Sequence, residues 1–157
     1  NYYIRMLGLP AIGWLTDKNV AMLSIVIIDV WKNVGFFVII LLAALQGVPR
    51  NLMEAARIDG ASPFTTLRRI KLPYIAPVIL FCVTYATIGG LQVFDSIKII
   101  TDGGPGDSTR SVVMYMFSEA FSAGELGTGA ASALTLLIVI AIVTAIQLTL
   151  GRRFAGR

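Results

Sequence analysis

Three polar side chains and one aromatic ring interrupt an apolar run in the N-terminal third of the chain. Asp29, Lys32, Asn33 and Phe36 stand at positions i, i+3, i+4 and i+7, so a helix places them on one stripe. Ionisable groups at membrane depth are costly, and they usually face a water-filled cavity or a partner. Two interpretations stay open: the stripe faces a water-filled cavity or a partner, or Asp29 and Lys32 pair with each other or lie at the membrane surface.

A pair of glycines stands near the far end of a later apolar run. Gly89 and Gly90 lie close in sequence to Thr84, Thr87 and Gln92. Glycine in a membrane helix either lets a neighbouring helix approach closely or loosens the helix beside a cavity. Packing is the commoner reason for such glycines, although the polar neighbours favour a cavity here.

Residues suited to catalysis, metal binding or nucleotide binding are scarce. The chain has no His and a single Cys, Cys82, which excludes an internal disulfide and a Cys/His metal site. No cluster of nucleophile, base and orienting residue is visible, so a membrane enzyme is the weakest interpretation. The glycine-rich segment 101–108 lacks the Lys-Ser/Thr ending of a phosphate-binding loop, so we reject nucleotide binding there. We predict a protein that is no enzyme and needs no cofactor.

The composition is that of a polytopic membrane protein. Of the 157 residues, 56% are hydrophobic and only 14% are charged, and the mean hydropathy is +0.79. Three apolar runs are each long enough to cross about 30 Å of hydrocarbon as a helix. We therefore predict an all-α membrane protein, a helical bundle of one domain with three transmembrane spans.

The predicted order of segments alternates between the two sides of the membrane. The segments are an external loop 1–19, a span 20–46, a cytoplasmic loop 47–73, a span 74–93, an external segment 94–126, a span 127–150 and a cytoplasmic tail 151–157. Pro77 would lie in the first turn of the second span, where its missing N–H costs little. The external segment should hold a turn at 101–108 and a short amphipathic helix from Thr109 or Ser111 to Phe121.

Basic residues set the predicted orientation. The segment 49–73 carries five of the 13 Lys and Arg residues, and the tail carries three. Cytoplasmic loops of membrane proteins are enriched in Lys and Arg, so both segments are predicted to face the cytoplasm. We attribute the net charge of +4 to this orientation and predict no nucleic-acid partner.

The polar segment 49–73 contains the start and stop signals of two short helices. Pro49 suits the first turn of a helix, and Gly60 suits the left-handed conformation that ends many helices. Ser62 is then a candidate N-cap, with Pro63 at the first helical position. We predict a helix, a tight turn, and a second short helix over 64–70.

Seven positions of this segment resemble the EAA loop of ATP-binding-cassette (ABC) importer permeases. They are Glu54, Ala55, Ala56, Gly60, Ile70, Leu72 and Pro73. In that family the loop is the cytoplasmic coupling element, a short helix seated in a cleft of the ATPase subunit. The resemblance implies that Glu54 is a polar anchor, that Ala55 and Ala56 form the contact surface, and that Gly60 is a hinge turn.

The resemblance extends to the subgroup that imports sugars, the maltose-type permeases. It rests on Trp31 before the Gly35-Phe36 step, on Phe94-Asp95, and on the run 101–105, Thr-Asp-Gly-Gly-Pro. Asp102 stands where the subgroup usually has a glycine, a mild departure in a loop. The resemblance implies the bundle of a type I ABC importer permease, of which this chain would be the C-terminal portion.

The resemblance also implies partners and a solute path. The expected partners are a second permease subunit, ABC ATPase subunits, an external solute-binding protein, a sugar and the lipid of a bacterial or archaeal cytoplasmic membrane. The positions that match the path of the sugar importers are Asp29, Lys32, Asn33, Phe36, Ala86, Gly89, Gly90 and Val93. Sugars need hydrogen-bonding side chains and an aromatic face, which Asp29, Asn33 and Phe36 supply.

Other functions remain possible on the sequence alone. The same type of importer could carry a phosphorylated polyol or an amino-acid derivative, since Lys32 suits an anion. A passive channel or a helical membrane scaffold belongs to a different class. Neither of these has a reason to place Glu54, Gly60 and Leu72-Pro73 in a basic loop, and neither should bind an ATPase.

Overall fold

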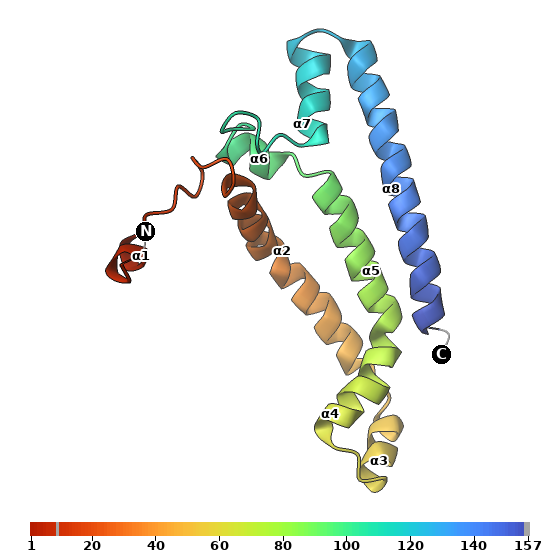
Figure 1. The fold of residues 1–157 in the computed structure, drawn as a ribbon. Coiled ribbons are helices and arrows are strands. Elements are labelled where there is room, and N and C mark those ends of the chain that lie inside the picture. The colour runs from red at the N-terminus through yellow and green to blue at the C-terminus, as the bar shows by residue number, and fades with distance from the viewer. Residues whose placement is uncertain (9, 156–157) are drawn as a thin grey trace. The chain divides into compact units, whose positions relative to one another are not determined.

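The computed structural model describes residues 1–8 and 10–155, and these residues form helices and loops without a strand. In chain order the elements are α1 Tyr2–Met6, α2 Ala21–Gln46, α3 Arg50–Ile58, α4 Pro63–Thr66, η1 Leu67–Lys71, α5 Leu72–Leu91, α6 Asp95–Ile100, α7 Val112–Phe117, η2 Ser118–Ser122 and α8 Leu126–Ala155 (Figure 1). The elements η1 and η2 are π-helical turns. The predicted all-α fold is confirmed, while the last two residues of the predicted tail, 156 and 157, lie outside the described residues.

Three helical stretches are long and apolar enough to cross a membrane. They are Ala21–Gln46, Pro63–Leu91 and Leu126–Gly151. In each helix, at most 11% of the most apolar 18-residue segment is buried within the chain. Outward-facing apolar side chains of this kind are expected where lipid or another protein surrounds a helix. The three helices confirm the prediction of a polytopic helical membrane protein.

The second of these helices begins earlier than predicted. The segment 64–70 is no separate short helix, because α4, η1 and α5 follow one another without a break from Pro63 to Leu91. Pro77 consequently lies inside the helix, whereas we predicted it in the first turn. Both predictions were wrong for one reason: they placed a boundary between segments at Pro73, which the helix passes through.

The π-helical turn η1 explains how the helix continues past a proline. Pro73 has no N–H to donate to the carbonyl of Arg69 four residues before it, and its ring would crowd that carbonyl. The turn η1, Leu67–Lys71, ends two residues before Pro73. A π turn has about one extra residue, because its N–H groups bond to carbonyls five residues earlier and not four. This change in hydrogen-bond pattern accommodates the proline without ending the helix.

The chain divides into two compact units. The first consists of Asn1–Lys32 and Leu91–Leu137, and the second of Asn33–Gly90 and Ile138–Arg157. The first unit has a small core in which Ile25, Ile97 and Met114 are buried and Val93 and Phe94 pack against them. Helix α6, which brings Ile97 into this core, lies in a segment that we predicted as a loop, and so does α1.

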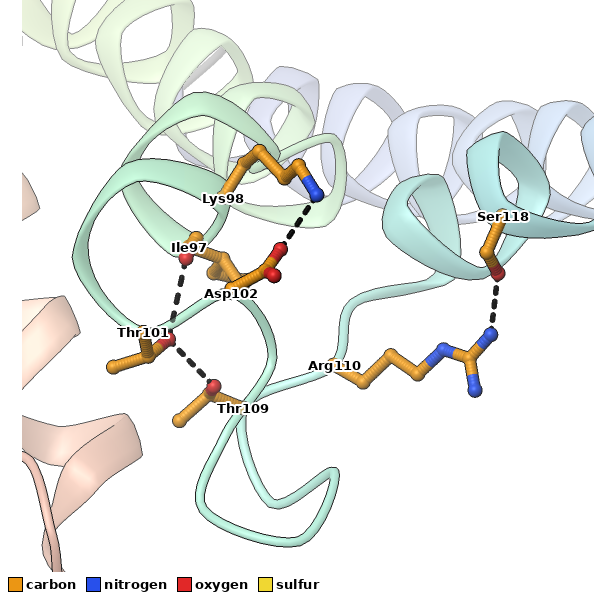
Figure 2. Close-up of polar contacts among 7 residues, drawn as sticks. All are labelled: Ile97, Lys98, Thr101, Asp102, Thr109, Arg110 and Ser118. Carbon is orange, nitrogen blue, oxygen red and sulfur yellow. Dashed lines mark hydrogen bonds and ion pairs between the residues drawn. The ribbon is translucent and has the colours of Figure 1, made fainter. Parts of the chain in front are cut away.

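A glycine loop, residues 101–110, lies within the first unit at the predicted turn (Figure 2). The hydroxyls of Thr101 and Thr109 lie 2.8 Å apart, and Thr109, which is fully buried, also donates to the carbonyl of Gly104 at 2.8 Å. Lys98 of α6 pairs with Asp102 of the loop at 2.6 Å. Helix α7 then starts at one of the two predicted positions, because the Ser111 hydroxyl accepts from the N–H of Met114.

The second unit is held by aromatic and polar contacts between its helices. Phe36 and Phe37 of α2 lie with ring centroids 5.3 and 6.2 Å from that of Tyr85 on α5. The Gln147 amide of α8 donates to the Thr87 hydroxyl of α5 at 2.8 Å. Interhelical contacts between aromatic and polar side chains are a usual means of joining membrane helices.

Candidate functional site

Helix α3 is closed by the left-handed glycine that the sequence predicts. Gly60 has φ +70°, and its N–H donates to the carbonyl of Arg57 at 3.1 Å. The N–H of Ala61 donates to the carbonyl of Ala56 at 2.9 Å. These two bonds form a Schellman motif, in which glycine is favoured because the position has a positive φ. The prediction that Gly60 ends this helix is confirmed.

The helix after the turn has the predicted cap. The Ser62 hydroxyl accepts from the N–H of Thr65 at 3.2 Å, and Pro63 occupies the first helical position. The hydroxyl of Thr66 also donates to the Ser62 carbonyl at 3.0 Å. We name residues 49–66, that is, α3, the turn at Gly60 and α4, the coupling hairpin, after the role that the sequence resemblance implies for this segment (Figure 1).

The predicted coupling residues of α3 divide between the surface and the interior of the chain. Glu54 and Ala55 are exposed, whereas Ala56 is only 5% exposed. Ala55 is thus accessible to a partner, whereas the chain's own atoms cover Ala56, and the prediction that both form a contact surface stays a prediction. Around Gly60 there is open space, because an added Cβ would meet no atom within 4 Å.

The remaining predicted coupling residues lie at the start of the long helix. Ile70 is half-buried in η1, and Leu72 and Pro73 are exposed at the first positions of α5. Sequence reasoning missed two large apolar side chains of the hairpin: Ile58 is 86% exposed and Phe64 is 70% exposed. The sequence signal of Ile58 was its place between Arg57 and Asp59, just before the helix-ending glycine.

The polar stripe on α2 contains an ion pair. The Lys32 ammonium lies 3.3 Å from the Asp29 carboxylate, as one of the two open interpretations predicted. A third side chain joins the pair, since the Ser96 hydroxyl of α6 donates to Asp29 Oδ1 at 3.0 Å. Lys32 Nζ in turn donates to Ser96 Oγ at 3.4 Å. Sequence reasoning did not find Ser96, which stands more than sixty residues away.

The other predicted path residues are distributed over both units. Asn33 and Phe36 continue the stripe on α2 in the second unit, and Gly89 and Gly90 belong to that unit as well. An added Cβ on either glycine would meet no atom within 4 Å, so neither is required for a close contact within the chain. Val93 belongs to the first unit, where it packs against the buried core.

Metal chemistry has no visible ligand set in the described part of the chain. Among residues 1–8 and 10–155, no group of three or more His, Cys, Asp or Glu side chains could hold a metal ion. Cys82 is buried as a free thiol. The chemistry that this structure offers is hydrogen bonding, ion pairing and aromatic contact.

Comparison with known proteins places the chain among transport components. A family model described as "Binding-protein-dependent transport system inner membrane component" matches residues 4–156. The trehalose/maltose transport system permease protein MalF of Thermococcus litoralis is 38% identical over 152 residues, which are 97% of this chain and 51% of that protein. A putative ABC transporter permease protein, ORF1 of Caldicellulosiruptor sp., is 38% identical over 135 residues, 85% of this chain and 96% of that one. The chain thus spans about half the length of MalF.

A solved structure has the same fold. It is the crystal structure of a bacterial alginate ABC transporter in complex with an alginate pentasaccharide-bound periplasmic protein. The match has a TM-score of 0.84 at 24% identity and covers 99% of this chain and 54% of that chain. The chain therefore shares its fold with about half of that chain.

Proposed function

This chain belongs to the family of binding-protein-dependent transport system inner membrane components, and from that premise we propose that it acts in a permease subunit of an ATP-driven importer for a sugar or oligosaccharide. The observation that carries the proposal is the coupling hairpin. It presents Glu54 and Ala55 on a short helix that is closed by Gly60 in the left-handed conformation. A separate ATPase subunit would supply the hydrolysis of ATP.

The coupling hairpin suits the transmission of movement from an ATPase. A helix wedged in a cleft transmits rigid-body motion when it is short and its ends are fixed, and both ends of this hairpin's turn are capped. Beyond the turn, the backbone stays helical from Pro63 to Leu91. We propose that closure of the ATPase dimer displaces α3 on the cytoplasmic side and that α5 follows because it is continuous with α4.

The solute path is proposed to include the polar stripe. Asp29 and Asn33 would hydrogen-bond to hydroxyl groups or their hydration water, Phe36 would offer an aromatic face, and the open space around Gly89 and Gly90 would leave room for a ring. The name of MalF, a trehalose/maltose permease protein, supports a sugar as the solute. Lys32, Ala86 and Val93 complete the positions carried over from the sugar importers.

The proposed assembly has four further members in a bacterial or archaeal cytoplasmic membrane. They are a second permease subunit, two ATPase subunits and an external solute-binding protein. Support for the last comes from the alginate transporter of similar fold, which was crystallised with a periplasmic protein. Co-purification of an ATPase with the full-length permease tests the class of function, because a passive channel or a scaffold should bring none.

Uptake measurements need a reporter solute, which a panel can supply. We suggest maltose, trehalose and arabinotriose as neutral members and glycerol 3-phosphate and digalacturonate as anionic ones. Each is offered in radiolabelled form to proteoliposomes that hold the complete importer with its binding protein. The member with the fastest ATP-dependent uptake serves as the reporter solute in the variants below.

The coupling role is tested at Gly60. Gly60→Trp should abolish ATP-driven uptake of the reporter solute and leave membrane insertion intact, because an added Cβ meets no atom of this chain within 4 Å and the bulk would lie where a partner is proposed to dock. Gly60→Asn should keep most of the uptake, since asparagine tolerates the left-handed conformation and is small.

Gly124 offers a matched control in the first unit. It has φ +75° and, like Gly60, open space around an added Cβ. Gly124→Trp introduces the same strain and bulk away from the coupling hairpin, and uptake should persist. Full uptake by Gly60→Trp would remove the coupling role, and equal loss in both variants would assign the effect to strain alone.

The path residues are tested separately from coupling. Asp29→Ala and Asn33→Ala should each raise the KM for uptake of the reporter solute, since each removes a proposed contact. Unchanged uptake and unchanged solute-stimulated ATPase activity in both variants would dismiss the stripe as the solute path while leaving the coupling proposal standing.

A further inference from the structure

Ser96, in the first turn of α6, contacts the polar stripe through its side chain. Its hydroxyl donates to Asp29 Oδ1 at 3.0 Å and accepts from Lys32 Nζ at 3.4 Å. The two charged groups are themselves 3.3 Å apart, so the three side chains form a closed triangle. The same carboxylate oxygen therefore receives the hydroxyl proton and faces the ammonium.

The partners of Ser96 are unusual for a hydroxyl in a helix of this protein. Thr87, Ser132 and Thr135 each donate to the backbone carbonyl four residues before them in their own helices. That bond is the ordinary way for a helical Ser or Thr to satisfy its proton. Ser96 instead bonds side chains of α2 that are 67 and 64 residues away in sequence. Its role is consequently between elements and not within α6.

The position of the Ser96 hydroxyl is fixed by the core of the first unit. Ser96 is 8% exposed, and the next residue, Ile97, is fully buried against Ile25 and Met114. Ile25 stands one helical turn before Asp29 on α2. The same core thus holds both the donor and the carboxylate that accepts from it, which leaves little freedom in their separation.

The charged end of the triangle is the exposed one. The Lys32 side chain is 58% exposed and the Asp29 side chain 28%, whereas Ser96 is buried. An ammonium has three N–H groups, and its contacts with Asp29 and Ser96 engage two of them. The triangle therefore presents hydrogen-bonding groups outward from a fixed base.

We infer that Ser96 is a positioning residue, which holds Asp29 and Lys32 as a neutral ion pair facing the solute, and that the site so built selects electrically neutral, hydroxyl-bearing solutes over anions. The inference rests on the proposed function, because it takes the stripe as part of the solute path. A carboxylate beside the ammonium cancels its net attraction for an anion, while both groups can still hydrogen-bond to hydroxyls.

The panel of solutes tests the selection. The fastest ATP-dependent uptake should belong to maltose, trehalose or arabinotriose. A wild-type importer that moves glycerol 3-phosphate or digalacturonate faster than all three, or that moves none of the three, overturns the inference. Asp29→Asn, which leaves Lys32 without its counter-charge, should shift the ratio of uptake rates toward the anions.

A pair of isosteric variants tests the positioning role of the hydroxyl. Ser96→Val removes the hydroxyl and should raise the KM for the reporter solute about tenfold, the effect expected for losing a hydrogen bond to a charged group. Ser96→Thr introduces a side chain of the same shape as Ser96→Val but keeps the hydroxyl. Its KM for the reporter solute should stay within about twofold of the wild-type value. Turnover at saturating solute should change little in either variant, once rates are normalised to assembled importer.

Two further variants separate positioning from a general structural effect. Ser132→Ala removes a hydroxyl that bonds its own helix and should leave the KM unchanged. In the Asp29→Ala background, Ser96→Ala should add nothing, because Ser96 acts through Asp29. If Asp29→Ala raises the KM and neither Ser96→Ala nor Ser96→Val does, this inference fails and the proposed path survives. If Asp29→Ala and Asn33→Ala have no effect, the proposed path and this inference fail together.

Discussion

The coupling hairpin of the second unit and the glycine loop of the first unit are both polar segments between apolar helices, yet they differ in how much of their closure comes from contacts between side chains. In the hairpin, the N–H groups of Gly60 and Ala61 donate to carbonyls of α3, and the Ser62 hydroxyl caps α4. The loop also has backbone hydrogen bonds, such as that from the Thr109 N–H to the Gly103 carbonyl at 3.2 Å, and it adds contacts between side chains: the Thr101 and Thr109 hydroxyls meet, and Lys98 pairs with Asp102 (Figure 2).

The difference determines what each segment can offer to a partner. Because the hairpin needs little from its longer side chains, Glu54, Ile58 and Phe64 project from it as exposed groups. The loop engages its own threonines and charges, and so it behaves as a closed spacer between α6 and α7. A segment that leaves its longer side chains exposed is therefore suited to docking, and a segment whose side chains contact one another is suited to fixing its neighbours, here α6 with Ser96.

The largest expected effect on stability comes from removing the hydroxyl at the centre of the loop. Thr109→Val keeps the shape but removes a fully buried hydroxyl, and the half-buried Gly104 loses the donor to its carbonyl. Leaving a buried group unpaired costs about 1–3 kcal/mol. Hydrogen exchange of residues 101–110 should accelerate, and exchange in the coupling hairpin should stay unchanged.

Ser108 provides the control in the same loop. Its hydroxyl is buried and has no hydrogen-bond partner in the described part of the chain. Ser108→Ala should thus leave exchange of the loop at the wild-type rate or slow it slightly. If Thr109→Val and Ser108→Ala have the same effect, side-chain closure of the loop is the wrong description.

The next effect concerns the cap of the hairpin. Ser62→Ala removes the acceptor for the N–H of Thr65, and loss of an N-cap costs about 1 kcal/mol. Exchange of the first amides of α4 should accelerate, while the glycine loop should keep its protection. Ser62→Asp, which restores an acceptor at the cap, should return the exchange to the wild-type rate. A change that spreads into the loop would contradict the local closure of the hairpin.

The features that could be predicted from the sequence are those with a local cause. Gly60 and Ser62 act on atoms within five residues of themselves, so residue type and spacing sufficed to predict the turn and the cap. The three membrane helices followed from length and hydropathy for the same reason. The continuous helix through Pro73 was missed, because the π turn that permits it has no residue signature comparable to a cap.

The features that escaped prediction depend on packing between distant segments. Ser96 joins Asp29 across 67 residues, and no periodicity connects the two positions. Ala56 and Ala55 are identical in type and adjacent in sequence, yet only one of them is buried. Which alanine faces the chain is decided by tertiary packing, and a helical stripe drawn on the sequence could not distinguish them.

The smallest expected effect lies at the polar contact between α5 and α8 of the second unit. Gln147→Met removes the hydrogen bond to Thr87, and interhelical bonds of this kind in membranes are worth about 0.6 kcal/mol. The variant also removes the buried Gln147 Oε1, which has no partner in the described part of the chain, and Thr87 keeps its own bond to the carbonyl of Val83 at 2.8 Å.

The loss and the gain at Gln147 nearly cancel, because an unpartnered buried acceptor carries a penalty comparable to a weak hydrogen bond. The free energy of unfolding of the detergent-solubilised protein should therefore change by no more than about 0.5 kcal/mol. The thermal unfolding midpoint should shift only by the small amount that corresponds to this change. A loss as large as that of Thr109→Val would show that side-chain hydrogen bonds hold the second unit as they hold the glycine loop. The difference from the glycine loop would then be a property of the coupling hairpin alone and not of the whole second unit.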